Sequence, residues 1–155
     1  MAQDLKLYIG GEWTDGTGAE VYELRSPATG EHIANVPIAS TADIERAVSA
    51  ARTAQDDFRH WSAFERAELC HRIATAVAAE VAEIARIQTL EQGKPYHAES
   101  LDDIAEANQY FLNAAEDIKR LDGRVIPTSD RNKRMFTFHR PVGVWAAITP
   151  WNFPV

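Results

Sequence analysis

The chain lacks the features that mark disulfide-rich, membrane-spanning and nucleic-acid-binding proteins. Its single cysteine, Cys70, excludes an internal disulfide and a cysteine-rich metal site, and agrees with a reducing compartment. No apolar run approaches the roughly 20 residues that span a bilayer, and no basic segment followed by an apolar one begins the sequence. Acidic residues outnumber basic ones, 23 against 16, and are mixed with them, so no continuous basic surface is predicted. We therefore expect a cytoplasmic protein without membrane or nucleic-acid partners.

What is present fits a folded domain that begins with short strands. Of the 155 residues, 45% are hydrophobic and 25% charged, which is typical of globular proteins. Residues 5–9 alternate between apolar and polar side chains, and Gly10-Gly11 then favours a tight hairpin. Gly16 and Gly18 lack the third glycine and the following helix of a dinucleotide fingerprint, so a turn is the better interpretation. Further strands are expected at residues 12–14, 21–24 and 32–38.

From Ser40 the apolar period changes to 3.6, which predicts a run of four helices. Ser40 or Thr41 is the expected N-cap of the first helix, and Ser62-x-x-Glu65 has the pattern of a capping box for the second. The third should end at Gly93, and the fourth, which is the longest, at Gly123. The helices are expected at about residues 41–58, 63–77, 81–92 and 96–121.

Three kinds of side chain could suggest a reactive or metal-binding site among these helices, and each has a simpler interpretation. Cys70 lies on an alanine-rich helix face, so we expect a largely buried thiol that reacts slowly rather than a nucleophile. The five histidines show no metal-ligand spacing. Asp102-Asp103 is most simply a solvated helix face. No metal site is predicted.

The last residues contain the most informative pattern. Residues 135–140 alternate as in a strand, and Val142–Ile148 is an apolar run typical of a strand buried on both faces. Pro150 and Pro154 then restrict the residues before them to extended conformations. Ligands of open parallel sheets bind beyond the carboxyl ends of the strands, where this loop is expected. Asn152 is therefore the candidate amide donor to an oxygen that gains negative charge.

The stretch from Pro141 to Pro154 resembles the signature of the aldehyde dehydrogenase family. The Pro-Trp-Asn-Phe-Pro element is highly specific, and four weaker segments resemble family segments in the same order. The resemblance covers nearly the whole chain. It implies the N-terminal portion of the α/β aldehyde dehydrogenase fold, with short strands, a helical layer and the first strand of a Rossmann-like parallel sheet, and no domain boundary within residues 1–155. The weaker segments are residues 9–13, 26–31, 90–95 and 123–127.

The resemblance also implies a reaction, which is the NAD- or NADP-dependent oxidation of a small aldehyde to a carboxylic acid. In the family a cysteine thiolate attacks the aldehyde, the adduct gives hydride to the cofactor, and a glutamate activates water. Both residues lie beyond the end of this chain in the family. Asn152 would be catalytic. The residues that would border the nicotinamide end of the cofactor are Ile148, Thr149, Pro150, Trp151 and Asn152.

Several further expectations depend on the same resemblance. Some members bind a monovalent cation near a position like that of Asp103, although the solvated face is the preferred interpretation. The variant Thr149-Pro150-Trp151-Asn152, with Arg-Asn-Lys-Arg upstream, resembles semialdehyde-type members. A homo-oligomer, dimer or tetramer, is expected for the full-length protein. The chain alone should be inactive and poorly stable. The alternative is a non-catalytic structural or subunit-association fragment.

Overall fold

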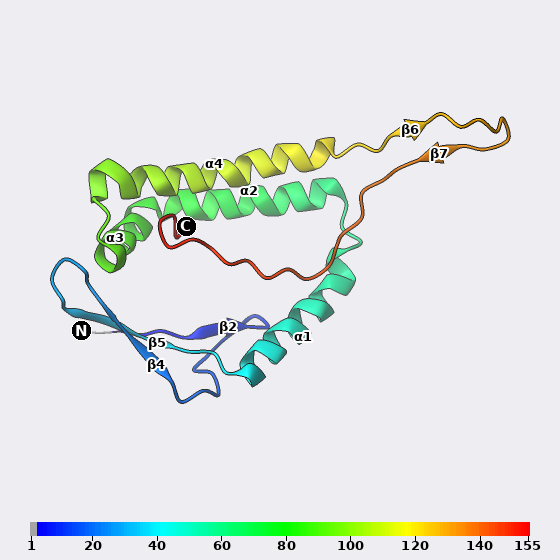
Figure 1. Ribbon diagram of the computed structural model, residues 1–155. Coiled ribbons are helices and arrows are strands. Elements are labelled where there is room, and N and C mark those ends of the chain that lie inside the picture. Colours follow the sequence, from blue (N-terminus) through cyan, green and yellow to red (C-terminus); the bar gives the residue numbers. More distant parts are fainter. Residues whose placement is uncertain (1–2) are drawn as a thin grey trace.

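The computed structural model describes residues 3–155 as small strands, a long helical layer and a projecting hairpin (Figure 1). Three strands form one sheet in the order β1-β5-β4, in which β5 pairs parallel with β1 and antiparallel with β4. The strands expected at residues 21–24 and 32–38 are thereby confirmed as β4 and β5, whereas β1 was not predicted. Their bounds are β1 Gln3–Asp4, β4 Val21–Arg25 and β5 His32–Pro37.

The predicted hairpin at Gly10-Gly11 is confirmed. Strand β2 (Leu7–Ile9) pairs antiparallel with β3 (Glu12–Thr14), and both glycines have positive φ, 62° and 89°. Side chains with a Cβ rarely adopt such a conformation, so the two glycines permit the tight reversal.

The first three helices begin where the sequence predicts and end within two residues of the predicted positions. Helix α1 (Thr41–Phe58) and helix α2 (Ala63–Ala79) each start with a capping box, in which a serine hydroxyl and an acidic side chain satisfy the first free N–H groups. Helix α3 (Val81–Gln92) ends at Gly93, whose φ of 85° is left-handed and whose N–H donates to the Thr89 carbonyl.

The fourth helical segment differs in detail from the prediction. It opens with a π-helical turn, η1 (Tyr96–Ser100), continues as α4 (Leu101–Asp117) and closes with a 3₁₀ turn, η2 (Ile118–Arg120). The segment was expected to reach about Leu121 and close at Gly123, and it ends at Arg120. Gly123 does not adopt the left-handed conformation that often closes a helix, because its φ is not positive. Gly123 is needed for another reason, since an added Cβ would collide with the Thr137 carbonyl.

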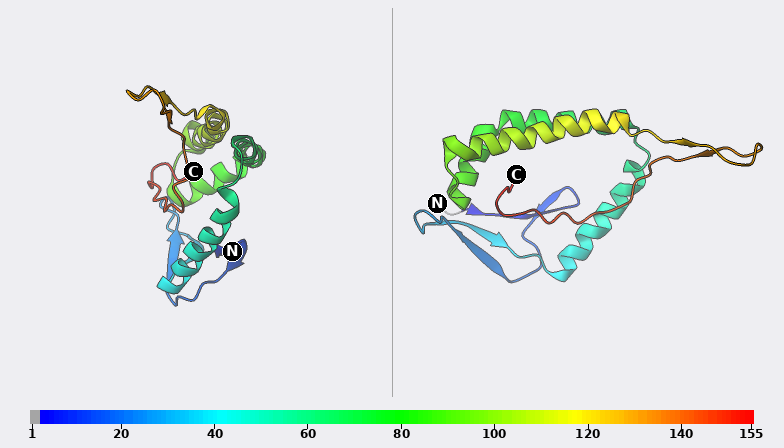
Figure 2. Two further views of the ribbon diagram at one scale, coloured as in Figure 1. Left: turned by 90° about the vertical axis from the view of Figure 1, so that its right-hand side faces the viewer. Right: turned by 45° about the horizontal axis from the view of Figure 1, so that its top comes forward.

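Small side chains let the helices approach closely. Helices α2 and α4 lie side by side along their length in Figure 1 and in the right-hand view of Figure 2. Ile104 is the one large apolar side chain that is fully buried among residues 3–155, and the rest of the buried apolar core is alanine. No helix of residues 3–155 combines the length and apolar character that a membrane crossing requires. The buried alanines are Ala34, Ala67, Ala74, Ala85, Ala107 and Ala115.

The C-terminal segment does not form the predicted buried strand. A short hairpin of β6 (Val125–Ile126) and β7 (Met135–Phe136) projects from the helices, and the chain then returns along them toward α3 (Figures 1 and 2). Residues 142–148 are unpaired, and Gly143 has a φ of 122°, outside strand conformations. A parallel strand needs hydrogen-bonding neighbours, and no strand within residues 3–155 lies beside it. Val142 and Ile148 are therefore 83% and 96% exposed.

Candidate functional site

The candidate site is the loop of residues 148–154, which ends the returning segment. Trp151 and Asn152 form a turn between Pro150 and Pro154, and the Asn152 side chain is exposed. Ile148 and Trp151 are also exposed, at 96% and 84%. The prediction that Asn152 lies in a loop is confirmed, whereas the strand expected to deliver that loop is absent. The structure thus presents residues 148–152 on one accessible stretch of backbone.

Two side chains that flank Gly93 hold this loop against the helices. The Gln92 side-chain amide donates a 2.5 Å hydrogen bond to the Trp151 carbonyl, immediately before Asn152. The Lys94 ammonium lies 4.2 Å from the centre of the Phe153 ring, immediately after it. Both residues that adjoin Asn152 in the sequence are therefore anchored, one through its backbone and one through its ring.

A buried polar cluster fixes Lys94 in turn. Its ammonium forms an ion pair with Asp103 of α4, and the two side chains are only 14% and 12% exposed. Gln88 of α3, which is 2% exposed, donates a 2.6 Å hydrogen bond to the same carboxylate oxygen. The interpretation of Asp103 as part of a solvated face is wrong, because an amide and an ammonium cover it. Of the pair Asp102-Asp103, only Asp102 is exposed, as predicted.

Sequence reasoning missed this anchoring set. Gln92 and Lys94 lie in a segment that resembles the family, but the sequence assigns them no role. It predicts that Asp103 is solvated. A usable signal was present, because Gly93 ends a helix between two long polar side chains and so presents both at one tip. What could not be predicted was that the chain returns 59 residues later to meet that tip.

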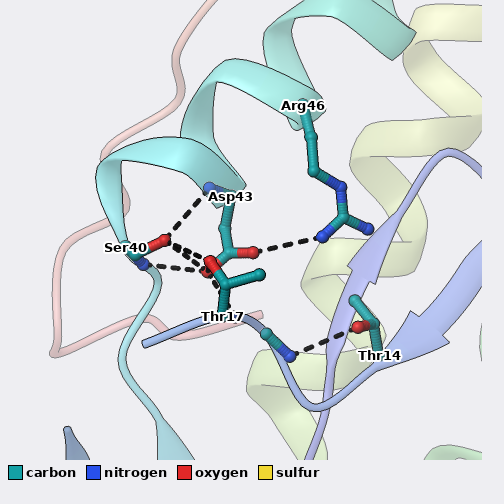
Figure 3. A network of polar contacts seen from close by, with 6 residues as sticks. Thr14, Thr17, Ser40, Asp43 and Arg46 are labelled. Atoms are coloured by element: carbon teal, nitrogen blue, oxygen red, sulfur yellow. Dashed lines mark hydrogen bonds and ion pairs between the residues drawn. The ribbon is translucent and has the colours of Figure 1, made fainter. Parts of the chain in front are cut away.

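A second polar network, remote in sequence from the loop, joins the N-terminal strands to α1 (Figure 3). Asp43 is fully buried and accepts hydrogen bonds from the Thr17 backbone N–H at 2.9 Å and the Ser40 hydroxyl at 2.8 Å. Arg46 pairs with its other oxygen at 3.3 Å. These hydrogen bonds, that from the Thr17 backbone first, hold the pKa of Asp43 far below its ordinary value. The donors belong to the fold, so we interpret this carboxylate as structural.

The remaining candidate chemistry is limited. Cys70 is half-buried, so the expectation of a largely buried thiol is too strong, although its place on α2 among small residues stands. Among residues 3–155, the side chains of His, Cys, Asp and Glu form no group of three or more that could hold a metal ion. The site that remains is the loop of residues 148–154 with its anchors.

Comparison with known proteins identifies the family to which this arrangement belongs. Residues 13–155 match the aldehyde dehydrogenase family. Glutarate-semialdehyde dehydrogenase of Pseudomonas putida KT2440 is 41% identical over 149 residues, which are 96% of this chain and 31% of that protein. Succinate-semialdehyde dehydrogenase [NADP(+)] of Escherichia coli K12 is 37% identical over 146 residues, 94% of this chain and 30% of that protein.

A solved structure agrees with the sequence comparison. Succinate-semialdehyde dehydrogenase from Burkholderia pseudomallei superposes with a TM-score of 0.92 and 43% identity, over 97% of this chain and 31% of that one. The chain belongs to the aldehyde dehydrogenase family and is similar to semialdehyde dehydrogenases within it. It spans about 31% of the length of the curated relatives and is an N-terminal portion of their fold.

Proposed function

We propose that the full-length protein oxidises a small aldehyde to a carboxylic acid with NAD or NADP, and that Asn152 is a catalytic residue of this reaction. The observation that supports the role of Asn152 is that it is exposed in a turn between two prolines, while the residues on either side of it, Trp151 and Phe153, are anchored. An amide held in advance can donate a hydrogen bond to the aldehyde oxygen as negative charge develops on it. The similarity to two semialdehyde dehydrogenases favours an aldehyde that also carries a carboxylate.

The same loop offers a surface for the nicotinamide end of the cofactor. Ile148 and Trp151 present apolar side chains beside Thr149, Pro150 and Asn152, which are also exposed. Such a surface fits a flat ring better than a charged group. When bound, the cofactor would supply the hydride acceptor. The E. coli relative named for NADP(+) supports a nicotinamide cofactor without deciding between NAD and NADP. The single cysteine agrees with a cytoplasmic location.

The test is the change of Asn152 to alanine in the full-length protein. Because the amide acts on charge present in the transition state, kcat for hydride transfer should fall on the order of 10²–10³-fold, with cofactor affinity nearly unchanged. Asn113→Ala, on the exposed face of α4, is the matched control and should leave turnover unchanged. An unaltered kcat in folded Asn152→Ala protein, with hydride transfer rate-limiting, would remove this residue from the mechanism.

The proposal includes a homo-oligomeric full-length protein. The hairpin of β6 and β7 projects from the helices, and Val125, Phe136 and Phe138 on or beside it are 84%, 65% and 57% exposed. Apolar side chains gathered on a projecting element favour contact with another subunit, which also supports a subunit-association role for the chain. Mass photometry of the full-length protein with Phe136→Ser and Phe138→Ser should give smaller particles than the unsubstituted protein. Equal masses would contradict this role.

A further inference from the structure

We propose that Lys94 is a positioning residue for Asn152, and that it holds the loop of residues 148–154 through an ion pair with Asp103 and contact with the Phe153 ring. This inference rests on the proposed catalytic role of Asn152. It concerns a residue that lies 58 positions earlier in the chain and does not itself reach the reacting atoms.

The first step is the geometry at the end of α3. Gly93 adopts a φ of 85°, and a Cβ at this position would lie 3.0 Å from the Pro27 ring. The left-handed turn lets the chain reverse within one residue, so Gln92 and Lys94 both reach the returning loop. Any other residue at position 93 would strain this turn and crowd Pro27.

The second step is the charge balance around Lys94. Its ammonium and the Asp103 carboxylate are each shielded from solvent, and the Gln88 amide donates to the same carboxylate. A shielded pair is weakly screened by salt and retains a defined geometry, unlike an ion pair on the surface. The lysine is thus a fixed point rather than a mobile side chain.

The third step is the contact between this fixed point and the loop. The face of an aromatic ring attracts a cation, and the 4.2 Å separation of the Lys94 ammonium from the Phe153 ring centre is within the range of that attraction. Phe153 and Val155 also border a hollow of about 220 Å³ whose other walls include Asp103 and Tyr110 of α4. Lys94 therefore holds Phe153, which follows Asn152, while Gln92 holds the Trp151 carbonyl, which precedes it.

These contacts matter for the proposed chemistry because a hydrogen-bond donor must be aimed before charge develops. A displacement of about 1 Å at a reacting group can lower a rate on the order of 10²-fold. Loss of the lysine should therefore lower turnover, and it should do so without removing a cofactor contact.

The experiment uses the full-length protein and two measurements on each variant. Lys94→Met removes the charge but keeps an apolar stem. We expect kcat to fall about tenfold or more, and KM for the cofactor to change by a smaller factor than kcat. Hydrogen exchange should accelerate in residues 148–155 and stay unchanged in α2. Lys94→Arg keeps a cation for both Asp103 and the ring, and should restore most of both properties.

Lys119→Met is the matched control. Lys119 lies in η2, at the opposite end of the helical segment from Asp103, and forms an ion pair with Glu116 at 2.6 Å. This variant should leave kcat and exchange in residues 148–155 unchanged. If Lys94→Met accelerates exchange throughout the helices, Phe153→Leu decides instead, since it removes the ring but leaves the Lys94–Asp103 pair. We expect it to show the same local acceleration and a lower kcat.

The outcomes separate this inference from the proposed function. Unchanged exchange in residues 148–155, or a normal kcat despite faster exchange, would overturn the positioning role of Lys94 even in a fully active dehydrogenase. An unsubstituted protein without aldehyde oxidation would overturn the proposed function. The exchange measurement would in that case still report whether Lys94 holds the loop.

Discussion

Replacement of Ile104 by alanine should loosen the helix that carries Asp103. Ile104 is fully buried on α4 and directly follows Asp103 in the sequence. The change removes three side-chain carbons, which at about 0.8 kcal/mol each corresponds to about 2.4 kcal/mol of lost apolar burial. The other buried apolar side chains among residues 3–155 are alanines, which are too short to fill the space, so a cavity term raises the loss to about 3 to 4 kcal/mol.

Native-state hydrogen exchange of the α4 amides in the full-length protein measures this loss directly, as the free energy of opening the helix. Ile44→Ala on α1 is the matched control. Its side chain is 55% exposed and alanine favours helix, so we expect a loss below about 1 kcal/mol. Ile104→Val, which removes one carbon, should cost about 0.5 to 1.5 kcal/mol and keeps the comparison possible if the alanine variant unfolds. A loss at Ile104 no larger than that at Ile44 would refute the reasoning.

Three further results are expected. The 155-residue chain alone should show no aldehyde-dependent reduction of NAD+ or NADP+ and should associate in size-exclusion chromatography, whereas turnover or a sharp monomer peak with a cooperative melt would contradict these expectations. Cys70, half-buried on α2, should react with a thiol reagent more slowly in the folded protein than after unfolding in urea, and equal rates would argue against its packing. Hydrogen bonds from Thr17 and Ser40 lower the pKa of Asp43 from its ordinary 3.8. The ionised carboxylate therefore stabilises the fold fully at pH values above about 3.8, and this stabilisation is lost as the pH falls below that value. The stability advantage over Asp43→Asn in urea titrations should therefore shrink between about pH 5 and about pH 2, and a constant difference would contradict the role of the charge.

Local signals in the sequence were sufficient for the first three helices and for the first hairpin. Ser40 with Asp43, and Ser62 with Glu65, satisfy free N–H groups within a few residues, so they act before any tertiary contact forms. The motif around Asn152 likewise indicated the family, because its two prolines and aromatic residues stand together in the sequence.

Features that depend on distant partners could not be predicted in the same way. Residues 142–148 have the composition of a buried strand, but a strand exists only through hydrogen bonds to neighbours that residues 3–155 do not provide. The sequence predicts Gly123 as a helix end, yet glycine is needed there because the Thr137 carbonyl across the hairpin leaves no room for a Cβ. In both cases the deciding atoms lie on other segments.

The same division applies to the candidate site. The sequence alone identified Asn152 and the rigidity of its loop, because backbone restriction by proline is a local property. Only the tertiary structure brought Gln92 and Lys94 to that loop, and only burial between α3 and α4 converted Asp103 from an apparently solvated acid into the partner of Lys94. The physical reason is that ion pairs and ring contacts depend on distance in space. Gln92 and Trp151 are 59 positions apart, and Lys94 and Asp103 are separated by the π-helical turn η1, so these distances are undetermined until the helices pack.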